Sequence, residues 1–92
     1  MEFAEKLYIG LSLTKKKERV IERMEQGKMV FSVYCVAEAS HPDNLYDIYS
    51  YYELKQPYYK DHPVKVLGIA GSKEEAIGLV AHMITDKNQG GY

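Results

Sequence analysis

The sequence predicts an α/β domain with a small parallel sheet of two or three strands and three helices. Two segments carry β-branched and aromatic residues on both alternating faces, which is the pattern of strands covered on both sides. Apolar residues at helical spacing follow each segment, and doubly covered strands occur mainly in parallel sheets. The expected strands are 28–37, 64–70 and, as an open alternative, about 6–11; the expected helices are 14–26, 41–55 and 72–86.

The composition is that of a folded domain, because 46% apolar and 27% charged residues exclude disordered and collagen-like classes. We expect one domain over 1–86 and a flexible, glycine-rich tail over 87–92. The single cysteine, Cys35, excludes an intramolecular disulfide and a cysteine-rich zinc site, and it suits a reducing compartment. We see neither a secretory signal nor an apolar run of ~20 residues, so the expected location is cytoplasmic and the protein soluble.

The first predicted helix, 14–26, begins after Thr14 as a plausible N-cap and ends at Gly27. On a helical wheel its residues fall into one apolar face and two charged flanks of opposite sign. The apolar face holds Leu13, Val20, Ile21 and Met24; the basic flank holds Lys15, Lys16, Arg19 and Arg23; the acidic flank holds Glu18, Glu22 and Glu25.

The second predicted helix, 41–55, opens at Ser40, which forms a pattern like a capping box with Asp43. Proline is tolerated in a first helical turn, so Pro42 agrees with this interpretation. A strand scores worse here, because its polar residues would be spread over both faces. The residues that share one face at helical spacing are Leu45, Ile48, Tyr49 and Tyr52.

The last strand, 64–70, is followed by a turn at Gly71 and a capping box of Ser72 with Glu75, which starts the helix 72–86. Apolar residues cover more than half of this helix, so we expect it to lie deep against the sheet. The segment 6–11 is either a short strand or the end of a frayed helix. Without it, a sheet of two strands would need completion by a partner subunit.

Several short segments resemble those of a group of small uncharacterised bacterial α/β proteins, and the resemblance covers nearly the whole chain. It implies a cytoplasmic folded domain and nothing about chemistry, because no activity, cofactor or catalytic residue is assigned to that group. The segments are Leu7-Tyr8-Ile9-Gly10, Pro42-Asp43-Asn44-Leu45, Gln56-Pro57-Tyr58-Tyr59 and Val66-Leu67-Gly68-Ile69-Ala70 with Glu74-Glu75-Ala76.

The predicted topology places a ligand pocket at the carboxyl edge of the sheet. A right-handed crossover between parallel strands would bring His41 and Asp43 beside Gly71 and Ser72, with His62 at the opposite edge. The strand-to-helix loop at Gly71 matches neither phosphate-loop motif, and two glutamates occupy the helix start. We therefore interpret the loop itself as a plain turn and cap.

The basic flank is unusual because Lys15, Lys16 and Lys17 would oppose the helix dipole in a first turn. A local rule broken without evident compensation can indicate function. Two interpretations stay open: a solvated face, or a surface of Lys15, Lys16, Arg19 and Arg23 that contacts phosphates or an acidic partner.

Six of the nine tyrosines lie between Tyr46 and Tyr59. Tyrosine combines apolar area with a polar tip and serves in cores and interfaces alike. On the predicted helix, Tyr49 and Tyr52 fall on the core face and are interpreted as structural. The candidates for an interface are Tyr46, Tyr51, Tyr58 and Tyr59.

No catalytic or metal-binding signature is present, because the histidines lack ligand spacing and Cys35 is expected to be an inert core thiol. We expect no cofactor. The leading hypothesis is a small binding or regulatory domain that acts through protein contacts, as a homodimer. The alternatives are nucleic-acid contact through the basic flank, and a small-molecule-binding protein or enzyme at the carboxyl edge; no membrane partner is expected.

Overall fold

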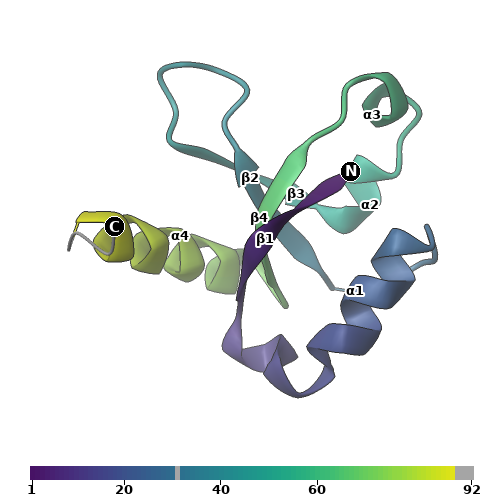
Figure 1. Cartoon of the computed structure of the whole chain (residues 1–92), viewed down its shortest axis with the longest axis horizontal. Helices are drawn as coiled ribbons and strands as arrows, with labels where there is room; N and C mark the ends of the chain where they lie inside the picture. Colours follow the sequence, from purple (N-terminus) through teal and green to yellow (C-terminus); the bar gives the residue numbers. More distant parts are fainter. Residues whose placement is uncertain (31, 89–92) are drawn as a thin grey trace.

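The computed structural model describes residues 1–30 and 32–88, the last of them by its backbone alone. Figure 1 shows a sheet with helices on two sides and a long hairpin loop at one end. The elements are β1 (Glu2–Ile9), the 3₁₀ helix η1 (Leu11–Lys16), α1 (Lys17–Glu25), β2 (Tyr34–Glu38), β3 (Tyr46–Ser50), α2 (Tyr51–Leu54), α3 (Tyr58–Asp61), β4 (Lys65–Ala70) and α4 (Lys73–Asn88).

The sheet has four strands in the order β1-β4-β2-β3, so the α/β class is confirmed in its coarse form. The expected parallel pairing of the second and last strands is wrong. β2 runs antiparallel to β4, with Cys35 opposite Ile69, and antiparallel to β3. The one parallel pair joins β1 to β4. The sheet is therefore mixed, and its last strand in sequence lies between β1 and β2.

The open alternative at 6–11 is resolved as a strand, and β1 is longer than expected because it begins at Glu2. It pairs with β4 from Glu2 opposite Lys65 to Ile9 opposite Ile69, with an irregularity between Phe3 and Tyr8. Gly68 allows this close approach, since a Cβ atom there would lie 2.9 Å from Leu79 Cδ2 and 3.2 Å from the Tyr8 carbonyl oxygen.

The expectation of one helix over 41–55 is wrong. The chain instead turns at 39–45, forms β3 as a hairpin with β2, and then adds the short helices α2 and α3. The side chain of Asp47 stabilises the turn, since its Oδ2 accepts hydrogen bonds from the Ser40 N–H and hydroxyl, both at 2.9 Å. The Ser40 N–H bond is the main reason that the pKa of Asp47 lies below its ordinary range. A hairpin needs no crossover, so the expected right-handed crossover is absent as well.

The strand expected over 28–37 is shorter, because β2 begins only at Tyr34. Residues 28–30, 32 and 33 connect α1 to β2, and Ser32 takes a left-handed conformation with φ 56°. That conformation is incompatible with a regular strand. Val30 and Val33 nevertheless reach the core from this loop.

Both faces of the sheet are covered, as the strand pattern predicted. Cys35, Val36 and Ala37 of β2 are fully buried. On one face Cys35 packs with Leu13, Val20, Met24 and Tyr51 from η1, α1 and α2. On the other face Val36 packs with Ala76 and Met83 of α4. Figure 1 shows α4 and α1 on opposite sides of the sheet.

The helix at the C-terminal end, α4, contacts the sheet through a narrower stripe than its composition predicts. Ala76 and Met83 are buried, whereas Ile77 is 55% exposed. The expected cap is present, because the Glu75 N–H donates to Ser72 Oγ at 3.0 Å. Of the expected tail 87–92, residues 87 and 88 belong to α4, and the rest lies outside the described residues. Within the described ranges, no helix has the length and apolar character needed to cross a membrane.

The first helix begins earlier than expected and in two parts. Thr14 is not its N-cap, because Thr14 lies inside η1 and its hydroxyl donates to the carbonyl of Gly10, the residue before η1, at 3.4 Å. Its end at Gly27 is confirmed. Gly27 has φ 71°, its N–H donates to the Met24 carbonyl, and the Lys28 N–H donates to the Arg23 carbonyl at 2.9 Å. These two bonds form a Schellman motif, in which glycine takes the left-handed position.

Candidate functional site

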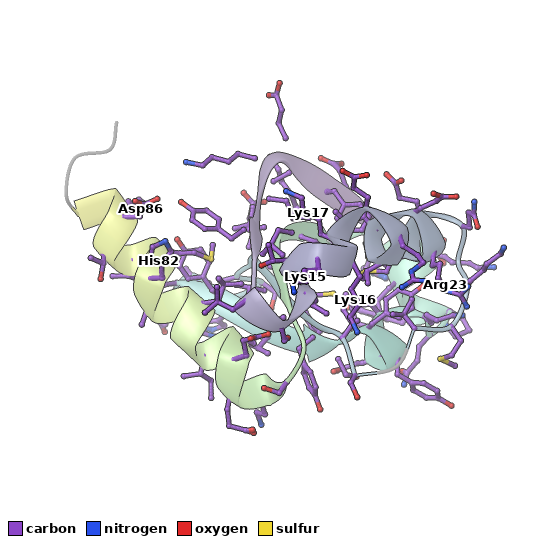
Figure 2. All side chains as sticks on the ribbon, turned by 90° about the horizontal axis from the view of Figure 1, so that it is seen from below. Lys15, Lys16, Lys17, Arg23, His82 and Asp86 are labelled. Atoms are coloured by element: carbon purple, nitrogen blue, oxygen red, sulfur yellow. The ribbon has the colours of Figure 1, made fainter. Side chains whose placement is uncertain are left out.

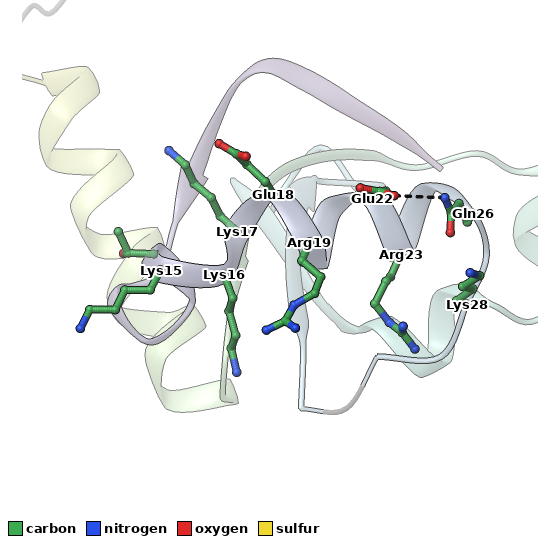
Figure 3. Close-up of a pocket in the computed structure, with 10 residues that line it drawn as sticks. Lys15, Lys16, Lys17, Glu18, Arg19, Glu22, Arg23, Gln26 and Lys28 are labelled. Carbon is green, nitrogen blue, oxygen red and sulfur yellow. Dashed lines mark hydrogen bonds between the residues drawn. The ribbon is translucent and has the colours of Figure 1, made fainter.

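The four cations of the basic flank line an open hollow of about 730 Å³ along η1 and α1. We call Lys15, Lys16, Arg19 and Arg23 the basic stripe. In Figure 3, Lys16, Arg19 and Arg23 extend to the same side of the helix, whereas Glu18 extends to the opposite side. All four are exposed. The four predicted cations therefore line one hollow, which Glu18 and Glu22 line as well.

The charges of this helix are sorted by sign rather than paired. Arg19 and Arg23 are four residues apart, and so are Glu18 and Glu22. Neighbours at this spacing on a helix repel when their charges are alike, at about 0.2–0.5 kcal/mol per pair. Opposite charges also occur at three-residue spacing, as in Lys15 with Glu18 and Arg19 with Glu22, but within the described residues these side chains form no ion pair. The arrangement leaves Lys16, Arg19 and Arg23 together on one side of the helix.

The stripe has little internal neutralisation. Within residues 1–30 and 32–88, no carboxylate lies at ion-pair distance from Lys15, Lys16, Arg19 or Arg23. Arg23 is held in place by a carbonyl, because its Nη2 donates to the Met29 oxygen at 3.2 Å. Half of the twelve lysines and arginines of the chain lie between Lys15 and Lys28, although the formal net charge is −1.

The expected conflict of the lysines with the helix dipole is reduced. Lys15 and Lys16 end the 3₁₀ helix η1, where the backbone carbonyls favour positive charge. Lys17 begins α1, and Glu18 beside it supplies the favourable charge of a first turn. The break between η1 and α1 therefore allows several cations in sequence at a smaller electrostatic cost than one continuous helix would.

The pocket expected from His41, Asp43, Gly71 and Ser72 is not assembled. Because β2 and β4 are antiparallel, the hairpin with His41 and Asp43 lies at the end of the sheet where β4 begins. Gly71 and Ser72 follow β4 at the other end and line a different hollow from His41. His62 precedes β4, so it lies at the same end as His41 and not opposite to it.

The residues at the hairpin contact each other only locally. His41 Nδ1 lies 3.6 Å from Asp43 Oδ2, and these side chains are 62% and 87% exposed. Such exposed pairs add little free energy.

Figure 2 shows His82 and Asp86 on α4, away from Lys16 and Arg23. Asp86 accepts a hydrogen bond from the Tyr8 hydroxyl at 2.7 Å, which holds its pKa below the ordinary range and fixes α4 to β1.

The tyrosines are distributed differently from the prediction. Tyr51, expected at an interface, is 1% exposed, and its hydroxyl donates to the Lys28 carbonyl at 2.9 Å. Tyr52, expected in the core, is 68% exposed. The replacement of the long helix by β3 and α2 causes this exchange. Tyr58 is 60% exposed, and Tyr59 packs edge-on between it and Tyr49, with ring centroids 5.0 and 5.7 Å apart.

A second hollow, of about 500 Å³, borders the basic stripe and was not predicted. Met29, Tyr34 and Tyr52 line one part of it, and Gly71, Ser72 and Lys73 line another. Met29 connects the two surfaces, since its carbonyl accepts the bond from Arg23. The hollow brings together three segments distant in sequence, so no local pattern in the sequence indicates it.

The other candidate groups have structural environments. Burial raises the pKa of the Cys35 thiol to about 12, so it is an unreactive core group, as expected. Among the described residues, no three histidine, cysteine or carboxylate side chains converge as metal ligands. Comparison with protein-family models, with curated proteins and with solved structures finds no match.

Proposed function

We propose that the protein is a small binding domain that uses the basic stripe to contact the phosphate backbone of a nucleic acid. The observation that carries this proposal is the grouping of charge on η1 and α1: Lys16, Arg19 and Arg23 extend to one side of the helix and Glu18 to the opposite side, although Glu18 and Glu22 also line the hollow. A helix surface that gives up favourable pairing in this way supports a ligand that supplies the missing negative charge.

The geometry of the stripe suits a linear array of phosphates. The stretch from Arg19 to Arg23 rises about 6 Å along α1 at 1.5 Å per residue, and Lys15 and Lys16 extend the stripe along the end of η1. The stripe can therefore reach several consecutive phosphates of one nucleic-acid strand. Arg19 and Arg23 offer planar forks that bind phosphate oxygens through two hydrogen bonds, and Arg23 is already oriented by Met29.

The charge distribution also limits the number of phosphates that the protein can contact. Glu18 and Glu22 lie on the same helix, and the whole chain has a formal net charge of −1. Long-range attraction to any polyanion is therefore weak, and binding depends on the local contacts of the stripe. For four contacts with a single strand, the slope of log affinity against log salt concentration should be about −3.

The test is a fluorescence-anisotropy titration of a labelled oligonucleotide at several salt concentrations. Wild type should bind with the steep slope given above. The triple variant Lys16→Gln/Arg19→Gln/Arg23→Gln should lose most of the affinity and flatten the slope. The matched control Lys6→Gln/Lys60→Gln/Lys65→Gln removes the same charge from exposed lysines that line neither hollow and should bind like wild type. A flat titration of wild type at low salt would contradict the proposal.

A second proposal gives the expected homodimer a location at β3. β3 is an outer strand, so its free edge has backbone groups with no strand partner among the described residues. The other outer strand, β1, is irregular and carries several charges, which protect an edge. Antiparallel pairing of two β3 strands about Ile48 would place Asp47 of one copy opposite Tyr49 of the other. Native mass spectrometry at micromolar concentration should show a dimer; a strict monomer would refute it.

The cytoplasmic location and the membership of the small bacterial protein group stay predictions. The lone buried Cys35 supports a reducing compartment. The proposed nucleic-acid contact is compatible with either expectation. Fractionation of the native cell would test the location directly.

A further inference from the structure

We infer that the nucleic acid is single-stranded and that one of its bases stacks on Tyr52 in the hollow beside the basic stripe. This inference rests on the proposed function, because the stripe supplies the phosphate contacts next to which the base would lie. It adds an aromatic contact to the phosphate contacts, and it specifies single-stranded nucleic acid as the class of ligand.

The Tyr52 ring is available for stacking. Tyr52 is 68% exposed, although the neighbouring Tyr51 is buried to 1%. Both belong to α2, and Tyr51 fixes this helix by donating its hydroxyl to the Lys28 carbonyl at 2.9 Å. The buried tyrosine therefore fixes the backbone of α2, from which Tyr52 extends. A tyrosine ring turns about only two side-chain bonds, so it loses little conformational entropy when a flat ligand covers it.

The hollow has the size and the lining of a site for a base. Its volume is about 500 Å³, within the range of roughly 300–1,000 Å³ for small-molecule sites. Met29, Tyr34 and Tyr52 supply apolar and aromatic surface, and Met29 is itself 40% exposed. Lys73 and Glu74 both line the hollow, so their charges oppose each other. A neutral aromatic ring fits these surroundings better than a phosphate does.

The hollow and the stripe are joined by a hydrogen bond. Arg23 Nη2 donates to the carbonyl oxygen of Met29 at 3.2 Å, and Met29 lines the hollow. A strand whose phosphate lies on Arg23 would therefore place a neighbouring base beside Met29, in the hollow that Tyr52 also lines. Cationic grooves next to exposed aromatic rings are typical of proteins that bind single strands. A base in a duplex is already stacked and paired, so it cannot occupy the hollow without being unpaired first.

The test compares an unpaired oligothymidine with a duplex of the same length by anisotropy at fixed low salt. Wild type should bind the single strand more tightly. Tyr52→Ala should weaken single-strand binding roughly 5- to 100-fold, the usual effect of one stacked base, without changing the salt slope. Tyr52→Phe keeps the ring and should restore the affinity. Tyr58→Ala removes another largely exposed tyrosine, which lines neither hollow, and should have no effect.

The outcomes separate the inference from the proposed function. Salt-dependent binding that is equal for single strand and duplex and insensitive to Tyr52→Ala would overturn the inference and leave the phosphate contact standing. Equal binding of polyglutamate would overturn both, because an acidic protein surface would then be the better partner. Urea unfolding of Tyr52→Ala should match wild type, which excludes loss of the fold as the cause of weaker binding.

Discussion

Glu75 joins two turns that are distant in the sequence. Its carboxylate accepts hydrogen bonds from the Gly71 N–H at 2.6 Å, the Ser12 hydroxyl at 2.6 Å and the Ser12 N–H at 3.1 Å. The sequence predicted Glu75 only as half of a capping box with Ser72. The structure shows that it fixes the start of η1 against the start of α4, and so positions the helix that carries the basic stripe.

Replacing Glu75 by glutamine should lower the free energy of unfolding by about 1 kcal/mol at pH 7, because the amide group cannot accept all three bonds. These bonds, the one from Gly71 first, hold the pKa of Glu75 below its usual 4.5. A lowered pKa gives stability that is present above pH 4.5 and is lost as the pH falls through the folded-state value. Urea unfolding should therefore show a difference from wild type that shrinks in acid. Glu74→Gln, with the same charge change at an exposed position, should show no such difference.

Replacing glycine by alanine should change the stability of the protein in opposite directions at Gly68 and Gly78. Gly68→Ala should destabilise the protein by roughly 1–3 kcal/mol, because the new Cβ would lie 2.9 Å from Leu79 Cδ2 and against the Tyr8 backbone. Gly78→Ala should stabilise it by about 1 kcal/mol, since nothing lies within 4 Å and alanine favours the helix α4. Thermal unfolding of both variants checks the pair, and equal shifts would show that the approach of β1 to β4 is wrong.

At the scale of elements, the end of α1 is the best-defined boundary. Gly27 has φ 71° in the Schellman motif, and the Gly27 carbonyl accepts from Lys55 Nζ at 2.7 Å. The Gly27→Ala variant should cost about 1 kcal/mol in unfolding free energy, because a side chain disfavours the left-handed conformation. Gly78→Ala serves as the control at a right-handed helical position. A neutral Gly27→Ala variant would contradict the description of this helix end.

The elements that the sequence predicted well are those whose end signals are local. Gly27 and Ser72 are such signals, and both function as expected. The prediction of a helix over 41–55 failed because Leu45, Ile48, Tyr49 and Tyr52 satisfy helical spacing, whereas Ile48 and Tyr49 also suit a strand that is half-buried on both faces. Leu45 and Tyr52 lie outside that strand and are exposed. Strand preference depends on tertiary neighbours. The neighbour that decided the outcome is β2, which lies beside β3 in the hairpin.

For the whole molecule, the incorrect expectation that β2 and β4 are parallel also misplaced the predicted ligand pocket. The sequence contains no direct signal for the direction in which β4 enters the sheet. Once β3 forms a hairpin with β2, β4 pairs antiparallel to β2, and His41 is separated from Gly71 and Ser72. The prediction of the basic stripe does not depend on strand pairing, because all of its members lie on one helical segment, η1 and α1. The Tyr52 hollow could not be predicted, since it depends on the packing of three distant segments.

The central claim is that the stripe on η1 and α1, together with the adjoining hollow, is the ligand-binding surface of this domain. The most direct measurement is an amide ¹⁵N–¹H chemical-shift titration with an unpaired oligonucleotide, which reports on each backbone position separately. The predicted result is a set of shifts confined to 14–30, to Tyr52 and to the start of α4. Shifts concentrated on β3 and the 39–45 turn, or no shifts at millimolar oligonucleotide in low salt, would contradict the claim.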